Sequence, residues 1–150
     1  MNLVRDTLHA VTLRDPHYVP IAADPDEFGV LNTHDAKSGY RSLIPEGQED
    51  DWDNECAGRI LGTVGLYRPV TAARDVDCPV FVGEATEDSI IPSGSVETLV
   101  RRLADVEHEQ YPIGHFDPYT GEWFDEVVAD ERDFLERHLL DGGSGASGPG

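Results

Sequence analysis

An acid and a histidine, Asp88 and His115, each follow an apolar run of the kind that forms a buried strand. Asp88 ends the segment Cys-Pro-Val-Phe-Val-Gly-Glu-Ala-Thr-Glu-Asp at 78–88, and His115 follows Tyr-Pro-Ile-Gly at 111–114. An imidazole, with an ordinary pKa of roughly 6.5, can take a proton from a hydroxyl nucleophile at neutral pH. A neighbouring carboxylate sets the tautomer of the ring and stabilises the imidazolium that forms. These residue types therefore predict the acid and the base of a Ser-His-Asp catalytic set.

The elements that position both side chains can be predicted from the pattern of apolar residues. The run at 80–82, Val-Phe-Val, is typical of a strand buried on both faces of a parallel sheet, and a loop over 83–88 follows it. A helix begins near Ser93, its expected N-cap, and a second, more polar strand covers 106–113. The apolar stripe of that helix comprises Val96, Leu99, Val100 and Leu103.

A last helix is predicted over 121–140, directly after the histidine loop. Its buried face is expected to comprise Phe124, Val127, Val128, Phe134, Leu135 and Leu139. From residue 78 onward the order strand, loop, helix, strand, loop, helix predicts an α/β fold. If the strands are parallel, both loops lie at the same edge of the sheet, where ligands bind in open α/β sheets.

Spacing alone leaves other interpretations of these residues open. A histidine in a loop is often an ordinary surface residue, and an aspartate before Ser-Ile-Ile-Pro is often a turn or capping residue. Glu84 and Glu87 compete with Asp88 as the acid, and Asp117 is near enough in sequence to contact His115 locally. The structure must therefore show which carboxylate meets the imidazole.

Residues 78–92 resemble the acid-bearing strand and loop of α/β-hydrolases, where an apolar strand leads to an aspartate followed by a hydrophobic residue and proline. Tyr-Pro-Ile-Gly-His-Phe at 111–116 is similar to the histidine loop of that family, and Phe-Leu-Glu-Arg-His-Leu at 134–139 to its last helix. The resemblance is specific over residues 76–140. It implies the C-terminal portion of an α/β-hydrolase fold, with Asp88 and His115 as the catalytic acid and base.

The nucleophile of that family sits in a Gly-x-Ser-x-Gly turn between a strand and a helix, and the sequence contains no such turn. Five serines lack the preceding apolar strand and the flanking glycines that such a turn needs: Ser38, Ser42, Ser89, Ser93 and Ser95. Ser144 and Ser147 belong to a Gly/Ser-rich tail, and the oxyanion loop of the family is missing as well. Cys56 and Cys78 are expected to be two buried thiols, neither of them a substitute nucleophile.

The chain is therefore predicted to be the C-terminal part of a serine hydrolase, whose serine lies on a polypeptide upstream of residue 1. The complete enzyme would act on a small-molecule ester or related acyl substrate, without a cofactor. The alternative is a non-catalytic truncated relic, or an interaction module that pairs through an exposed strand edge. Two strands alone make a poor sheet, so an upstream polypeptide or self-association is expected to complete it.

The N-terminal half is predicted to be organised differently from the rest of the chain. Residues 1–75 resemble the cap or lid that this family inserts before the acid strand, mostly helical or irregular. Helices are expected over 3–14 and 54–67, the second preceded by the acid run at 49–55 and burying Cys56, Ile60, Leu61 and Val64 on one side. The domains are thus 1–75, 76–140 and a disordered tail, 141–150.

The charge balance excludes several classes of partner. The chain has 30 acidic and 11 basic residues, a net charge of −19, so no basic patch is available to bind nucleic acid. No apolar run is long enough to span a membrane, and no signal peptide is apparent, which favours the cytoplasm. The six histidines show no metal-ligand spacing. Acids spread over the whole chain favour a salt-accumulating organism, with an ordinary acidic protein as the alternative.

Overall fold

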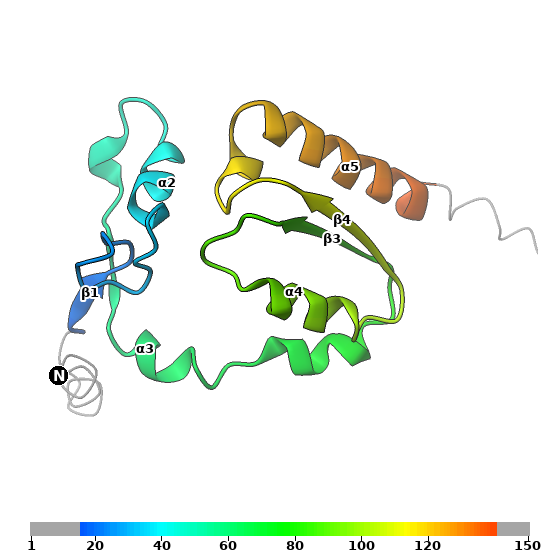
Figure 1. Ribbon diagram of the computed structural model, residues 1–150, viewed down its shortest axis with the longest axis horizontal. Helices are drawn as coiled ribbons and strands as arrows, with labels where there is room; N and C mark the ends of the chain where they lie inside the picture. Colours follow the sequence, from blue (N-terminus) through cyan, green and yellow to red (C-terminus); the bar gives the residue numbers. More distant parts are fainter. Residues whose placement is uncertain (1–15, 141–150) are drawn as a thin grey trace, which may run out of the picture. The chain divides into compact units, whose positions relative to one another are not determined.

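The computed structural model describes residues 16–140, which form two units, 16–71 and 72–140 (Figure 1). The helix predicted over 3–14 and the tail 141–150 lie outside the described residues. The division between the units falls after Thr71, inside the 3₁₀ helix η2, Pro69–Asp75.

The first unit is built on a short antiparallel pair, β1 (Tyr18–Pro20) and β2 (Glu55–Ala57). The side chain of Asn54 closes this pair, because its Oδ1 accepts from the amide of Ala22 at 2.8 Å and its Nδ2 donates to the carbonyl of Ala22 at 2.7 Å. The core of the unit is small, and its most buried side chains are Val19, Ala22, Ala23 and Ala36.

The helix predicted over 54–67 is wrong. Residues 55–57 pair with β1, and only Ile60–Thr63 (α3) is α-helical. Gly58, Gly62 and Gly65 weaken any longer helix by roughly 1 kcal/mol each relative to alanine. The ladder to β1 and the Asn54 side-chain bonds offer the backbone a better alternative. The residues expected on a buried helical side are correspondingly not buried, with Ile60 and Val64 exposed.

The rest of the first unit contains one α-helix, α2 (Ala36–Ser42), and a short 3₁₀ helix, η1 (Glu49–Asp51). The acid run thus begins a single 3₁₀ turn and not a long helix. After it, the indole of Trp52 stacks on the ring of Tyr40, with centroids 5.8 Å apart and planes within 6°.

The second unit contains the predicted order of strand, helix, strand and helix. Its elements are β3 (Val80–Ala85), α4 (Ser93–Val100), β4 (Val106–Tyr111), η3 (Asp117–Tyr119) and α5 (Gly121–Leu139). β3 and β4 are parallel, with Val80 opposite Val106 and Ala85 opposite Tyr111, which confirms the α/β prediction. Helices α4 and α5 lie on opposite sides of this pair (Figure 1).

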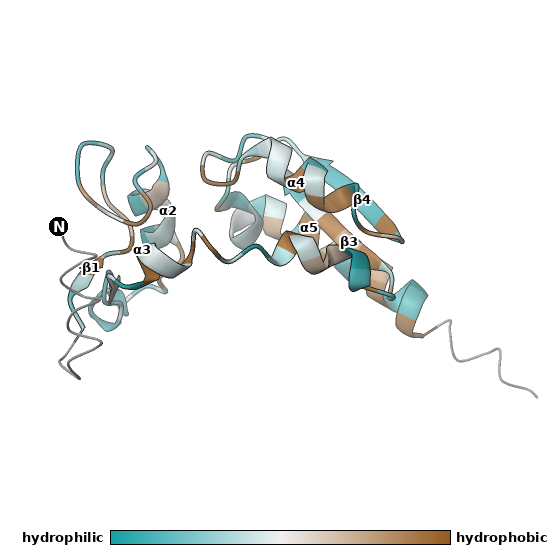
Figure 2. Cartoon of the chain, turned by 90° about the horizontal axis from the view of Figure 1, so that it is seen from below, coloured by the Kyte–Doolittle hydropathy of each residue, from teal (hydrophilic) through white to brown (hydrophobic). Residues whose placement is uncertain are grey.

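Helix α5 covers one face of the two strands. The ring of Phe134 packs on Phe81 with centroids 5.7 Å apart, and the hydroxyl of Tyr111 donates to Asp130 at 2.8 Å. Burial and the Asp130 carboxylate both raise the pKa of the Tyr111 phenol. The core residues Tyr111, Ile113 and Val127 thus fix the helix to the end of β4 that leads to His115. Figure 2 shows the hydrophobic residues gathered around these strands and in patches on α4 and α5.

Burial in the second unit is lower than the sequence predicts. β3 runs three residues beyond the expected run at 80–82, yet its apolar side chains are only half-buried, and Cys78 is exposed. Of the predicted buried face of α5, only Val127 and Phe134 are buried; the exposed members are Phe124, Val128, Leu135 and Leu139. The N-cap of helix α4 is Pro92, whereas Ser93 was predicted, and no residue of the helix is fully buried. Two strands are too narrow to cover two amphipathic helices.

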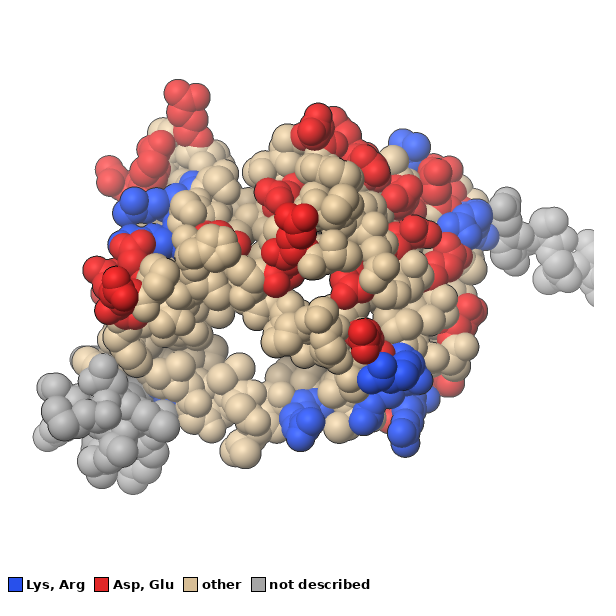
Figure 3. All heavy atoms as spheres, in the orientation of Figure 1, with Lys and Arg blue, Asp and Glu red and all other residues tan. Residues whose placement is uncertain are grey.

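The surface is strongly acidic, as the composition requires. Figure 3 shows Asp and Glu side chains spread over the visible face and not gathered in one patch. Some acids are paired: Arg137 holds Glu107 with two bonds of 2.7 Å, and with His138 it lowers the pKa of Glu107 to about 2. No helix in the described part of the chain has the length and apolar character needed to cross a membrane.

Candidate active site

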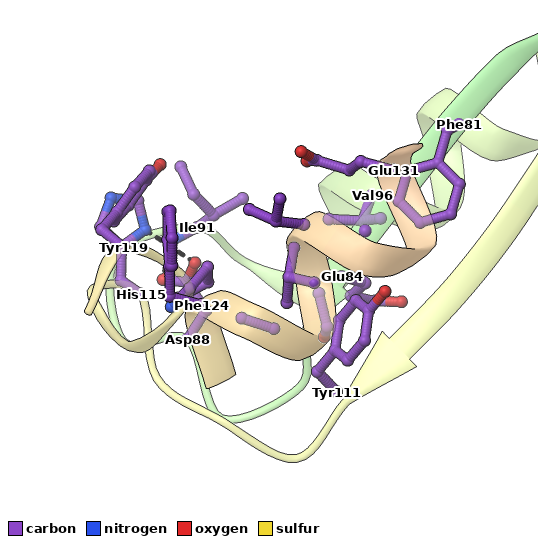
Figure 4. Close-up of a pocket in the computed structure, with 16 residues that line it drawn as sticks. Phe81, Glu84, Asp88, Ile91, Val96, Tyr111, His115, Tyr119, Phe124 and Glu131 are labelled. Carbon is purple, nitrogen blue, oxygen red and sulfur yellow. Dashed lines mark hydrogen bonds and ion pairs between the residues drawn. The ribbon is translucent and has the colours of Figure 1, made fainter. Parts of the chain in front are cut away.

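The structure brings Asp88 and His115 together. Nδ1 of His115 lies 2.8 Å from Oδ2 of Asp88, and both side chains are largely shielded from solvent (Figure 4). Each residue lies on a loop that leaves the carboxyl end of its strand, β3 for Asp88 and β4 for His115. Because the strands are parallel, these ends meet at one edge of the sheet, as predicted.

Asp88 is held in place by the backbone that follows it. Its Oδ1 accepts from the amides of Ile90 and Ile91 at 2.7 and 2.8 Å, which leaves Oδ2 for His115. Burial raises the pKa of Asp88, but the bonds from the Ile91 amide, His115 and the Ile90 amide together hold it below its ordinary value. The carboxylate is therefore ionised at neutral pH and oriented to accept from the imidazole.

The strand pairing continues into the two loops and sets their separation. The amide of Thr86 donates to the carbonyl of Tyr111 at 2.8 Å, and the amide of Glu87 donates to the carbonyl of Ile113 at 3.0 Å. Asp88 and His115 follow these bonds by one and two residues respectively. The acid and the base are thus attached to a continuous hydrogen-bonded ladder and not to independent loops.

His115 is oriented by the residues on either side of it. Ile113 and Phe116 are buried, and the Phe116 ring meets the imidazole edge-on, with centroids 4.9 Å apart. The amide of Gly114 donates to Oδ2 of Asp117 at 2.8 Å, which closes the loop locally. Nothing in the loop requires glycine at 114, because its φ is not positive and a Cβ there would meet the Asp117 carboxylate only at ordinary contact distance.

The competing acids do not contact the histidine. Glu87 is exposed, and Asp117 binds the Gly114 amide. Glu84 bonds to other residues, because strand alternation places it on the same face as His108 and Gln110. Nε2 of His108 and Nε2 of Gln110 each donate to Oε2 of Glu84 at 2.8 Å. Among these carboxylates, Asp88 is the one bonded to His115.

The Glu84 cluster is a feature that the sequence analysis missed. Glu84 is only 5% exposed. The register of β3 against β4 pairs Val82 with His108 and Glu84 with Gln110. A signal existed, since His108 and Gln110 are two residues apart in a strand and so share one face. That signal becomes useful only once the register of β3 against β4 is known.

Replacing Glu84 by alanine should destabilise the protein by about 1–3 kcal/mol, because His108 and Gln110 would lose a shared buried acceptor. Glu109→Ala, on an exposed position of the same strand pair, is the matched control and should change stability by less than about 0.5 kcal/mol. Urea unfolding of the three proteins measures both effects. Equal stability of the Glu84 and Glu109 variants would show that the cluster contributes nothing.

A pocket of about 400 Å³ adjoins the Asp88–His115 pair. His115, Asp88 and Tyr119 lie at one end of it, and Phe81 and Glu131 at the other (Figure 4). Its lining is mainly apolar with three carboxylates, Glu84, Asp88 and Glu131, and no lysine or arginine. A bound group would therefore be neutral or cationic at the end that carries Glu131.

The nitrogen that would act as the base, Nε2 of His115, has no hydrogen-bond partner within residues 16–140. No serine, threonine or cysteine of the described chain bonds to it, although Ser93 also lines the pocket. The same described residues contain no group of three or more His, Cys, Asp or Glu side chains able to hold a metal ion. The geometry can accept a proton at Nε2 and stabilise the resulting imidazolium, but it needs a nucleophile from elsewhere.

Comparison with known proteins gives relatives that are longer than this chain. No model of a known protein family matches the sequence. The quorum-quenching protein AidA of Acinetobacter baumannii strain MDR-ZJ06 is 31% identical over 134 residues, which cover 89% of this chain and 43% of AidA. An uncharacterized 31.7 kDa protein of Escherichia coli, from the traX-finO intergenic region, is 32% identical over 113 residues, 73% of this chain and 39% of its own. The chain thus spans less than half the length of these relatives.

Solved structures decide the fold. DcsB, determined with a substrate analogue, superposes with a TM-score of 0.73 over 91% of this chain and 50% of its own, at 16% identity. The α/β-hydrolase GrgF from Penicillium sp. sh18 gives a TM-score of 0.66 over 91% of this chain and 47% of its own, at 13% identity. The chain has the C-terminal portion of an α/β-hydrolase fold. At such identities the superposition shows the fold alone, and the role of each residue must come from the site.

Proposed function

We propose that the chain supplies the acid and the base of a serine hydrolase, with His115 as the base and Asp88 as the carboxylate that orients it. The observation that carries this proposal is the 2.8 Å bond from Nδ1 of His115 to Asp88, which leaves Nε2 available. The nucleophilic serine and the oxyanion donors come from a polypeptide segment outside this chain. The substrate is a small ester or a related acyl compound.

The chemistry follows from the tautomer that Asp88 imposes. With its proton on Nδ1, His115 accepts the hydroxyl proton of the serine at Nε2 as the serine oxygen attacks the acyl carbon. Collapse of the tetrahedral intermediate expels the leaving oxygen, which takes the same proton back from Nε2. Water then releases the acid by the same two proton transfers, and Asp88 remains ionised throughout.

The name of the relative AidA suggests a narrower substrate class. AidA is called a quorum-quenching protein, and it is 31% identical to this chain. We therefore propose that the complete protein inactivates a signalling molecule by cleaving an acyl bond. The apolar end of the pocket beside His115, with Ile91, Tyr119 and Phe124, suits an uncharged substrate of this kind.

We propose a second candidate function, because Nε2 of His115 has no nucleophile beside it within the described residues. In that case the chain is a non-catalytic relic or an interaction module, and the Asp88–His115 bond only stabilises the loops. Both functions require a partner that covers the exposed apolar residues of α5. Those residues therefore support the interaction module as much as they support the hydrolase.

Ester turnover separates the two functions. The chain alone should hydrolyse p-nitrophenyl esters no faster than free imidazole, because it lacks a nucleophile. A chimera of AidA, with its aligned segment replaced by the corresponding residues of this protein, should hydrolyse them well above that level. A folded chimera without activity, beside an active unmodified AidA, would favour the non-catalytic function. Turnover by the chain alone that is lost in His115→Ala would reveal a nucleophile within it.

We further propose that this is a cytoplasmic protein of a salt-accumulating organism, on the basis of its net charge of −19. Repulsion between the acids should loosen the fold at low ionic strength, and salt screens that repulsion. Molar KCl should therefore raise the melting temperature by about 5 °C or more, since roughly 1 kcal/mol shifts a domain of this size by several degrees. A melting temperature that does not depend on KCl would contradict the proposal.

A further inference from the structure

We propose that Ile91, Tyr119 and Phe124 bind the alcohol part of an ester, with Tyr119 as the residue that selects it. The substrates of the complete enzyme are then esters of uncharged, apolar alcohols. This inference rests on the proposed function, because it assigns one part of the substrate to one part of that site. It goes further in naming the leaving group, and not the acyl group, as the part that these three side chains recognise.

Tyr119 is held beside the base by a short turn. It ends η3, four residues after His115, and its amide donates to the carbonyl of Phe116 at 3.2 Å. Pro118 restricts the backbone of this turn, and Phe116 is buried. Tyr119 is nevertheless 58% exposed, and it lies with His115 at one end of the pocket (Figure 4). An aromatic ring in a fixed position is thus available for contact with a bound molecule.

Ile91 and Phe124 extend the apolar surface around the acid. The amide of Ile91 donates to Oδ1 of Asp88 at 2.8 Å, so the bond that orients the carboxylate also fixes this residue. Phe124 lies in the first turn of α5. Both residues line the pocket, and they are 42% and 45% exposed. Large apolar side chains gathered in a pocket with a few polar groups are typical of a small-molecule site.

Proton transfer decides which part of the substrate lies here. When the bond between the acyl carbon and the leaving oxygen breaks, that oxygen takes the proton from Nε2 of His115, so the two atoms lie about 3 Å apart. The acyl carbon is at that stage bonded to the serine, and the oxyanion donors hold its oxygen. The serine and these donors belong to a segment outside this chain. The alcohol part, attached to the oxygen beside His115, is therefore the part nearest to Tyr119.

Charge and access narrow the class of occupant. The pocket has three carboxylates and no lysine or arginine, so an alcohol that carries a phosphate or a carboxylate group would be repelled. A polypeptide segment laid permanently over this end of the pocket would keep any substrate from Nε2 of His115. The occupant that satisfies both conditions is the uncharged, apolar alcohol part of the substrate.

Two isomeric esters, hexyl acetate and methyl heptanoate, test the assignment in the AidA chimera. The long chain lies on the alcohol side in the first ester and on the acyl side in the second. Each kcat/KM is divided by that for methyl acetate, and titration of the released acid measures all three. Tyr119→Ala should lower the hexyl acetate ratio about tenfold, the discrimination that burial of one or two methylene groups supplies. The methyl heptanoate ratio should change by less than about threefold.

Three further variants support the comparison. Tyr119→Phe keeps the ring and should keep the hexyl acetate ratio within about threefold. Phe124→Ala should lower that ratio in the same direction as Tyr119→Ala, so the test does not depend on the folding of one variant. Leu139→Ala is the matched control, because Leu139 is 71% exposed on α5 but does not line the pocket, and it should leave both ratios unchanged.

The outcomes separate this inference from the proposed function. In an active chimera, the inference is overturned if Tyr119→Ala lowers the methyl heptanoate ratio as much as the hexyl acetate ratio, or lowers neither. A loss of the same size in Tyr119→Phe would assign the effect to the hydroxyl group and would also overturn it. A folded chimera that hydrolyses none of the three esters, beside an active unmodified AidA, overturns the proposed function and this inference with it.

Discussion

In the AidA chimera, His115→Ala will lower kcat for ester hydrolysis by about 10⁴- to 10⁶-fold, the range found when the base of a serine triad is removed. Nε2 of His115 is the group that would take the serine proton, and no other described imidazole lies on this loop. KM should change little, because the imidazole acts on the transition state more than on bound substrate. Steady-state kinetics with a p-nitrophenyl ester measure both constants.

The matched control is His138→Ala, since His138 lies on α5 and bonds to Glu107, away from the pocket. It should keep kcat within about threefold of the unmodified chimera, provided the circular dichroism spectrum is unchanged. If His115→Ala loses less than about tenfold in kcat, below the usual contribution of a general base, His115 is not the base.

In the same chimera, Asp88→Asn will lower kcat by roughly 10³- to 10⁴-fold. An asparagine side chain can direct its amide group at Nδ1, which moves the ring proton to Nε2 and leaves no acceptor for the serine hydroxyl. The two amides of Ile90 and Ile91 still find an oxygen at this position, so the loop should keep its structure. Kinetics and a thermal melt of the variant separate lost chemistry from lost folding.

Asp117→Asn is the control for the acid. Asp117 lies in the histidine loop, but its carboxylate accepts from the Gly114 amide and not from His115. An asparagine oxygen can keep that bond, so kcat should stay within about threefold. A larger loss with Asp117→Asn than with Asp88→Asn would exchange the roles of the two acids.

Much of this site could be predicted from the sequence because its determinants are local. Asp88 and His115 each follow a strand directly, and the parallel pairing of neighbouring strands then brings them to one edge. Spacing could not decide between Asp88 and Glu84, since both lie near the end of β3. The register settles this, because it directs Glu84 to His108 and Gln110.

The errors arose where tertiary contacts outweigh local pattern. Residues 54–67 have helical spacing of apolar residues. Residues 55–57 nevertheless form a strand, because they pair with Tyr18–Pro20 and because the Asn54 side chain bonds to the backbone of that segment. Pairing across more than thirty residues leaves no mark in a short sequence window. The predicted burial of α5 failed for a different reason: its apolar face is correct as a pattern, but the described chain covers only part of it.

We propose that Asp88 and His115 act as one catalytic unit, and the double variant Asp88→Asn/His115→Ala in the AidA chimera tests this most directly. Residues of one catalytic unit have strongly non-additive effects on kcat. The double variant should therefore be no slower than His115→Ala alone, within about threefold, because the carboxylate has no function without the imidazole. If the losses of the two single variants multiply in the double variant, the two residues act independently and do not form one catalytic unit.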